Sequence, residues 1–225
     1  MLLYAITDRR LFAKNEILPR ESLIGLARKL SRGGVDYFQI REKDLSDRDL
    51  LDLTIQIVEA VREECAGRDD VMKVLLNGSP EIAFEAGADG VHLPGCSHPE
   101  SRAKAIAAVH KAYAGSGCDP VISHSCHTAE EAVQAREASI LLFAPVFEKR
   151  VHAGSSPDSG ADFLPGQGLA RLTEACQASG DTPVLALGGV TAKNAPACVQ
   201  AGARGVAAIR LFLGEEWRQL WQAPR

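Results

Sequence analysis

The feature that most constrains the fold is a regular alternation of short apolar runs with helix-type segments. Eight runs of β-type residues occur along the chain, and each is followed by a segment in which the apolar residues are spaced for a helix. The runs are apolar throughout instead of alternating with polar residues, which is typical of parallel strands covered on both faces. They span residues 2–7, 35–41, 73–77, 89–93, 120–125, 139–146, 183–189 and 204–212.

Eight strand–helix units in 225 residues predict an α/β protein with one domain over residues 1–225, a (β/α)8 TIM barrel. An internal echo supports this prediction, because "EAGADGV" (85–91) and "QAGARGV" (200–206) each end a helix and open a strand with glycine. Ser46, Ser79 and Thr128 are expected to cap helices. A doubly wound sheet is the alternative, but no G-x-G-x-x-G follows the first strand.

Composition excludes several classes of partner. The net charge is −4 and the basic residues form no stripe, so neither nucleic acid nor a membrane surface is an expected partner. No apolar run approaches the roughly 18 residues of a membrane span, and the start lacks a signal-peptide pattern. The six cysteines form no CxxC pair, as in reduced proteins. We therefore expect a cytoplasmic protein.

One segment interrupts the rhythm. Residues 147–168, "FEKRVHAGSSPDSGADFLPGQG", form a long stretch without periodicity after the sixth strand. Such loops in compact domains are usually lids or binding loops, and a tolerated surface insertion is the alternative.

In a barrel of this kind the active site lies at the carboxyl ends of the strands. The second strand ends "FQIREKD", where Gln39, Arg41 and Lys43 share one parity and suit an anionic ligand. The alternative is that Arg41 and Lys43 pair with the neighbouring acids Glu42, Asp44 and Asp47. Asn77, which ends the third strand, is either a ligand contact or a turn residue.

The segment "ISHSCHT" (122–128) raises the question of a metal site. On an extended strand Ser123, Ser125 and His127 point to one side, and His124 and Cys126 point to the other. The two histidines and the cysteine cannot converge on one ion, so we expect no metal there. His127 precedes a helix start, where a neutral imidazole is favoured, and it is the candidate base.

The ends of the last two strands indicate a phosphate site. Gly188 and Gly189 precede a helix and let the backbone approach a phosphate closely. In barrels of this class the loops after strands seven and eight commonly bind phosphate, and Ile209 and Arg210 end strand eight. Arg210 could instead turn toward Glu215 or Glu216.

The chain resembles the thiamine phosphate synthase and TenI superfamily over almost its whole length. The resemblance rests on "LYAITD", "FQIREKD", "VLLNGSPEIAFEAGADGVHLP", "SCHTAEEAVQA", "LLFAPVF", "VLALGGVT" and "AGARGVAAI". Synthases of the family carry an Asn-Asp pair where this chain has Asn77-Gly78, and an acidic residue near the position of Ser97. Those two carboxylates are the family's magnesium ligands, and their loss favours the TenI branch, whose activity is isomerisation of a carboxythiazole phosphate.

The resemblance therefore implies a thiazole tautomerase without a cofactor, in which His127 moves the proton. Arg41 and Lys43 would hold the carboxylate of a small thiazole substrate. The same substrate would be contacted by Gln39, Asn77 and Ser125. Its phosphate would be bound by Gly188, Gly189 and Ile209–Arg210. One rival is thiamine phosphate synthase itself, a magnesium-dependent transferase joining a pyrimidine pyrophosphate to a thiazole phosphate. A second rival is a barrel that binds a ligand of the pathway without turnover. The sequence leaves a homo-oligomer open.

Overall fold

The computed structural model of the protein describes residues 1–12, 19–96, 98–151 and 162–222. Eight parallel strands close into a barrel in the order β1-β10-β9-β6-β5-β4-β3-β2. These strands are β1 (Leu2–Ile6), β2 (Tyr37–Ile40), β3 (Lys73–Leu76), β4 (Gly90–Leu93), β5 (Val121–Cys126), β6 (Ile140–Phe143), β9 (Val184–Leu187) and β10 (Gly205–Ala208). The prediction of a TIM barrel is confirmed.

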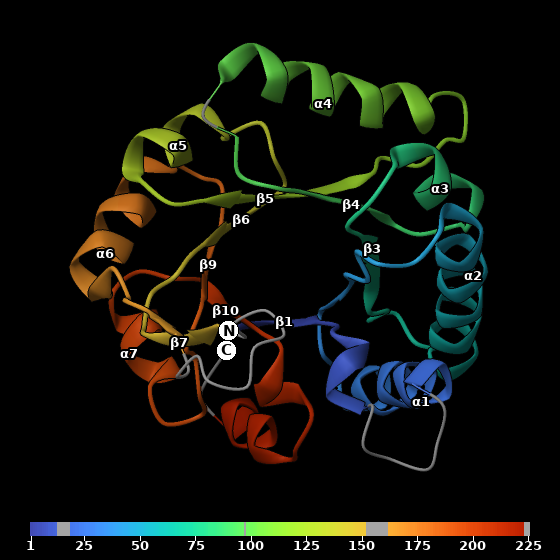
Figure 1. The fold of residues 1–225 in the computed structure, drawn as a ribbon, viewed down its shortest axis with the longest axis horizontal. Helices are drawn as coiled ribbons and strands as arrows, with labels where there is room; N and C mark the ends of the chain where they lie inside the picture. The colour runs from blue at the N-terminus through green and yellow to red at the C-terminus, as the bar shows by residue number, and fades with distance from the viewer. Residues whose placement is uncertain (13–18, 97, 152–161, 223–225) are drawn as a thin grey trace.

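Helices surround the barrel as an outer ring (Figure 1). They are α1 (Pro19–Arg32), α2 (Asp47–Glu64), α3 (Pro80–Glu85), α4 (Pro99–Ala112), α5 (Ala129–Gln134), α6 (Gly168–Ala178) and α7 (Ala195–Gln200). The three predicted N-caps are confirmed, because the hydroxyls of Ser46, Ser79 and Thr128 accept backbone N–H groups of the helices that they precede. Short 3-10 turns complete the chain: η1 (Arg9–Phe12), η2 (Arg210–Phe212) and η3 (Glu216–Gln222).

Two details differ from the sequence prediction. The eighth helix is replaced by the 3-10 segment η3, which is anchored by the fully buried Trp217. The segment 147–168 is not entirely irregular, because β7 (Lys149–Val151) and β8 (Asp162–Leu164) pair as an antiparallel two-stranded sheet. Residues 152–161, which make up much of the predicted loop, lie outside the described part of the chain.

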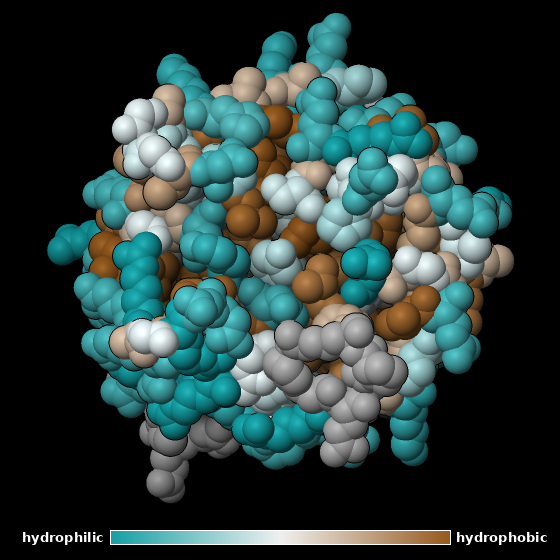
Figure 2. All heavy atoms as spheres, turned by 180° about the vertical axis from the view of Figure 1, so that it is seen from behind, coloured by the Kyte–Doolittle hydropathy of each residue, from teal (hydrophilic) through white to brown (hydrophobic). Residues whose placement is uncertain are grey.

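The strands bury both of their faces, which explains their continuous apolar runs. One face contributes to a small cluster inside the barrel, made of Tyr4, Ile6, Leu75, Ile140, Leu142, Leu185 and Ala207. The other face packs against the helices in a much larger cluster. Viewed from behind, hydrophilic side chains cover the rim of the molecule and hydrophobic ones show near its middle (Figure 2). Parity along each strand therefore separates residues that face the barrel interior from those that face the helices.

No helix in the described part of the chain is both long and apolar enough to pass through a bilayer.

Candidate active site at the carboxyl ends of the strands

The second strand places its polar residues at the mouth of the barrel, as the parity predicts. Gln39 lies in register with Ile6 of β1 and Leu75 of β3, both of which belong to the interior cluster. Its side chain is only 1% exposed, and its Nε2 group is buried without a hydrogen-bond partner in the described structure. A buried amide without a partner costs free energy. Gln39 is therefore suited to meet a ligand that enters from the mouth.

Two of the acidic neighbours of Arg41 and Lys43 contact a different arginine. Arg9, which follows β1, contacts Glu42 at 3.6 Å and Asp44 at 2.7 Å through its Nη1 atom. Glu42 is buried, accepts a 2.6 Å hydrogen bond from the Thr7 hydroxyl, and has its pKa raised by that burial. Within the described residues Arg41 and Lys43 form no ion pair, so the alternative interpretation of surface pairing is not what the structure shows.

A chain of hydrogen bonds that the sequence analysis missed runs through the barrel interior beneath this cluster. The Tyr4 hydroxyl lies 2.8 Å from Ser123 Oγ, and Ser123 Oγ lies 2.8 Å from His92 Nδ1. The other ring nitrogen of His92, Nε2, lies 3.0 Å from the hydroxyl of Ser125. The signal was present in "GVHL", where His92 has the inward parity, but a histidine in an apolar strand did not stand out.

His92 is held neutral by its surroundings. Burial is the main cause that lowers its pKa to about 3, and the nearby His124, Arg41 and Lys43 contribute to the same lowering. Ser125 was predicted to contact substrate, and its register with Leu142 of the interior cluster places it on the inward face of β5, as Gln39 is on the inward face of β2.

His127, the predicted base, lies exposed beside the ends of three strands. Its Nδ1 atom is 2.6 Å from the carbonyl oxygen of Ala144, which follows β6. Since a carbonyl can only accept, Nδ1 carries the proton and a neutral ring has its free lone pair on Nε2. A side chain on Gly95, after β4, would come within 2.9 Å of that Nε2 atom. The ring is thus held between the segments that follow β4 and β6.

His124 and Cys126, the other members of the segment 122–128 considered for a metal site, face the helices, on the side opposite Ser123 and Ser125, as predicted. Cys126 is fully buried and His124 is 2% exposed, with its Nδ1 atom 2.7 Å from the carbonyl oxygen of Ser125. In the part of the chain that the structure describes, no three His, Cys, Asp or Glu side chains gather in a way that could hold a metal ion.

The described residues do not fit the magnesium site that the family resemblance implies. Residue 78 is a glycine, and the neighbouring Asn77 offers an amide oxygen but no charge. Two carboxylates follow the ends of β1 and β2, and both have other partners. Asp8 pairs with Arg10 at 2.8 Å, and Glu42 accepts a hydrogen bond from Thr7. Ser97, the other position of interest, lies outside the described residues.

The predicted phosphate site lies at the ends of two adjacent strands, β9 and β10. Gly188 and Gly189 have φ angles of 96° and 65°, a backbone conformation that favours glycine. A side chain on Gly189 would come within 2.5 Å of the Glu148 carbonyl oxygen, so these glycines also let the segment after β6 pack closely. Ile209 packs against the interior cluster, while Arg210 begins η2 and is exposed.

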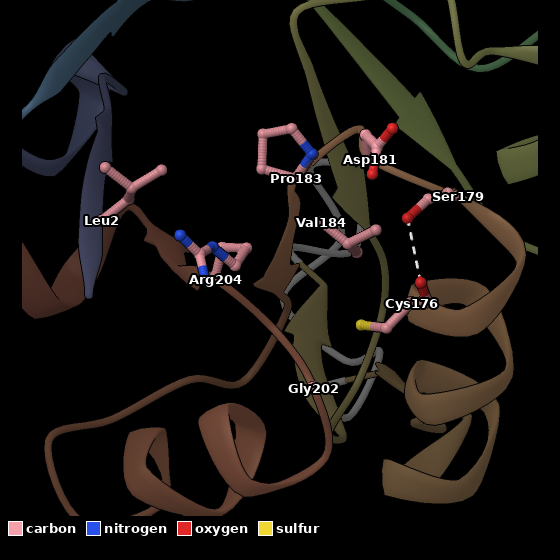
Figure 3. Close-up of a pocket in the computed structure, with 9 residues that line it drawn as sticks. Leu2, Cys176, Ser179, Asp181, Pro183, Val184, Gly202 and Arg204 are labelled. Atoms are coloured by element: carbon pink, nitrogen blue, oxygen red, sulfur yellow. Dashed lines mark hydrogen bonds between the residues drawn. The ribbon is translucent and has the colours of Figure 1, made fainter.

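The described residues line one cavity beside the candidate site and another far from it. One of about 360 Å³ is found between α5 and α6 and is lined by His127, Gln167 and Arg171. The other, of about 410 Å³, is at the opposite end of the barrel, where β1, β9 and β10 begin (Figure 3). Figure 3 shows Arg204 and Leu2 on one side of it and Cys176 and Ser179 on the other. Active sites of such barrels lie at the carboxyl ends, so this second cavity is not the candidate site.

Comparison with known proteins decides the family. The family model described as thiamine monophosphate synthase (TMP-TENI) matches residues 3–212. This chain belongs to the thiamine monophosphate synthase family. A thiamine-phosphate synthase of Methanoculleus marisnigri is 35% identical over 192 residues, which cover 84% of this chain and 80% of that protein. The thiamine-phosphate synthase of Roseiflexus castenholzii is 32% identical over 215 residues, which cover 95% of this chain and 81% of that protein.

A solved structure of this family has the same architecture. The thiamine phosphate pyrophosphorylase of Pyrococcus furiosus superposes with a TM-score of 0.68 at 26% identity, covering 97% of this chain and 90% of that one. The prediction of a tautomerase was wrong, because the relatives that match almost the whole chain are named as synthases. The proton-shuttle role of His127 was specific to that activity and is not carried further.

Proposed function

We propose that the protein is a thiamine phosphate synthase, a transferase that joins a pyrimidine pyrophosphate to a thiazole phosphate with release of pyrophosphate. The observation that carries the proposal is the similarity to synthases along nearly the entire chain. The geometry of the mouth is in keeping with it, because two cations without acidic partners in the described structure lie beside an amide with a free N–H group. This set of groups matches a strongly anionic substrate.

The chemistry requires that negative charge on a leaving pyrophosphate be stabilised as its bond to the pyrimidine portion breaks. Arg41 and Lys43 are proposed to bind the pyrophosphate, since cations already in position stabilise developing negative charge without reorganising. Gln39 and Asn77 are proposed to orient the pyrimidine portion. The backbone of Gly188–Gly189 and Ile209–Arg210 is proposed to hold the phosphate of the thiazole.

Magnesium enters this proposal only as a companion of the pyrophosphate, because Mg²⁺ often keeps several waters and binds mainly through substrate phosphates. No role is assigned to it in the chain. We further propose that the protein works in the cytoplasm, where its six free cysteines would stay reduced.

The test is an assay of pyrophosphate release by the purified protein, with both substrates and with each omitted in turn, in magnesium buffer and in EDTA. The proposal predicts release only when both substrates are present. Binding of both substrates without release would identify a ligand-binding barrel instead, and release without the thiazole would identify a hydrolase.

A further inference from the structure

We propose that His92 is a positioning residue that aims the hydroxyl proton of Ser125 outward at an acceptor oxygen of the substrate, with its direction set by Tyr4 and Ser123. The identity of the substrate rests on the proposed function, but the hydrogen-bond pattern does not. The inference concerns the four-member chain Tyr4–Ser123–His92–Ser125, which we call the interior relay.

The relay is built by strand register. His92 on β4 lies opposite Ser123 on β5, and Ser125 is two residues further along the same strand, so both serines face the barrel interior. The imidazole bridges them through its two nitrogens, at 2.8 Å and 3.0 Å. β1 lies four strands from β5 in either direction around the barrel, so the Tyr4 hydroxyl crosses the interior to reach Ser123.

The direction of the hydrogen bonds follows from counting protons. A neutral imidazole has one N–H group, and the deep end of the relay, Tyr4, is fully buried among apolar residues. If Tyr4 donates to Ser123 and Ser123 donates to Nδ1, then the Nε2–H group donates to Ser125. In that arrangement every proton in the interior has an acceptor, and the one remaining proton is that of Ser125, at the mouth.

The reverse arrangement is unfavourable. If Nδ1 carried the proton and donated to Ser123, either the Tyr4 or the Ser123 hydroxyl would keep a proton with no acceptor among the relay atoms. Leaving a buried donor unsatisfied costs about 1–3 kcal/mol, which corresponds to a roughly 5- to 150-fold preference for the other tautomer. The interior therefore sets which way Ser125 points.

The relay ends where the substrate is expected. Ser125 is partly buried, on the same face as Gln39 and Arg41, and the charged groups that act on His92 are His124, Arg41 and Lys43. The positive charges of Arg41 and Lys43 oppose a second proton on the ring. Such a proton would sit on Nδ1, so Nδ1 could no longer accept the hydrogen bond from Ser123, whereas the Nε2–H bond to Ser125 would remain. Because Nε2–H donates to Ser125, the hydroxyl proton of Ser125 is left for an acceptor at the mouth, beside cations that attract the same anionic oxygen.

The first experiment observes the tautomer directly and needs no substrate. Nitrogen-15 NMR of the histidine side chains, with His92 assigned by comparison with His92→Asn, is expected to show a protonated Nε2 and an unprotonated Nδ1 at neutral pH. Ser123→Ala and Tyr4→Phe should both move His92 toward a mixture of tautomers. A protonated Nδ1 in the wild-type protein, or a ring unaffected by both variants, would overturn the relay.

The second experiment tests whether His92 acts through Ser125. Ser125→Ala and Ser123→Ala are each expected to lower kcat/KM, the former by about tenfold or more, as for loss of a hydrogen bond to a charged group. In the Ser125→Ala background, Ser123→Ala and His92→Asn should cause no further loss. Losses that multiply would show that His92 and Ser123 act on folding or on the substrate independently of Ser125.

Tyr113→Phe is the matched control for Tyr4→Phe. Tyr113 is also buried and its hydroxyl also makes one hydrogen bond, a 3.0 Å bond to the Ala88 carbonyl oxygen, but it packs among the helices outside the barrel. Tyr4→Phe should lower kcat/KM while Tyr113→Phe leaves it unchanged. If the wild-type protein makes no product at all, the proposed function fails while the NMR result still decides the relay.

Discussion

Arg9 engages Glu42 and Asp44, two of the acids that could otherwise pair with Arg41 and Lys43. Arg9 follows β1, more than thirty residues earlier in the chain, and its guanidinium lies against Glu42 and Asp44. The "REKD" segment by itself favours local pairing equally well, since opposite charges alternate along it. The choice is made by the adjacency of β1 and β2, which brings Arg9 into contact with both acids.

The first prediction concerns Arg41. Arg41→Ala should weaken binding of inorganic pyrophosphate, and raise KM for the pyrimidine pyrophosphate, by about 10- to 100-fold, as expected for a charge-assisted hydrogen bond. Isothermal titration and initial rates measure the two effects. Arg204→Ala is the control with the same change in charge, because Arg204 lies at the opposite end of the barrel. Equal losses in both variants would mean that net charge, and not the mouth, binds the anion.

The second prediction concerns the stability contributed by a neutral His92. Its pKa is about 3 in the folded protein and about 6.5 when unfolded, so between these values the unfolded chain binds more protons. This term is fully favourable to folding above pH 6.5 and is lost as the pH falls, by at most about 1.4 kcal/mol per pH unit. Urea unfolding of wild type and His92→Asn should give a difference in unfolding free energy that shrinks from pH 7 to pH 5. A constant difference would contradict the neutral state.

At the level of elements, the backbone explains why the segments 85–91 and 200–206 have similar sequences. Gly87 and Gly202, with φ angles of 70° and 103°, follow α3 and α7, while Gly90 and Gly205 open β4 and β10. A side chain on Gly90 would lie 1.9 Å from the Val121 carbonyl oxygen, and one on Gly205 would lie 2.0 Å from that of Leu2. The backbone of the neighbouring strand occupies the space that a Cβ atom would need at each glycine. The two similar sequences therefore mark two equivalent strand starts.

The third prediction follows from that contact. Gly90→Ala should lower the free energy of unfolding by about 1–3 kcal/mol or more, because a backbone carbonyl cannot move aside as a side chain can. Gly25→Ala, in the exposed part of α1 with open space around it, should instead stabilise the protein by up to about 1 kcal/mol through helix propensity. Urea denaturation of both variants provides the comparison. A harmless Gly90→Ala would mean that the strands can separate at this point.

At the scale of the whole molecule, the barrel is closed on one side without a full eighth helix. Trp217 in η3 is completely buried, and a side chain on Gly33, just after α1, would collide with its ring. Phe212 packs next to it, with ring centroids 6.2 Å apart. One aromatic side chain thus fills the gap between the last segment and the first helix.

The fourth prediction tests that closure. Trp217→Ala should lower the free energy of unfolding by about 3–5 kcal/mol, as is usual for a large buried aromatic residue. Phe84→Ala, a change in a 43% exposed side chain on α3, should cost much less. Equal effects in thermal or urea unfolding would show that η3 does not contribute to the core.

The barrel could be predicted from the sequence because the alternation of strand and helix segments repeats eight times. The site could be predicted only in part. Parity predicted that Gln39 and Arg41 share a face of one strand and that Ser123 and Ser125 share a face of another, since it needs only the strand limits. It could not reveal the bonds of His92 or the partners of Arg9, because these depend on which strands become neighbours. The activity was predicted wrongly because the absence of a carboxylate at Gly78 favours a tautomerase, whereas the retained cations Arg41 and Lys43 suit the pyrophosphate of a synthase substrate.

The most direct test of the account is a measurement of thiamine phosphate formed per pyrophosphate released, by the wild-type protein supplied with the pyrimidine pyrophosphate and the thiazole phosphate. Chromatography with fluorescence detection of the oxidised product measures the first quantity, and a coupled phosphate assay measures the second. The account predicts equal amounts of both products, at a rate that falls sharply in Arg41→Ala. Absence of thiamine phosphate while both substrates bind, or pyrophosphate in excess of it, would contradict a synthase.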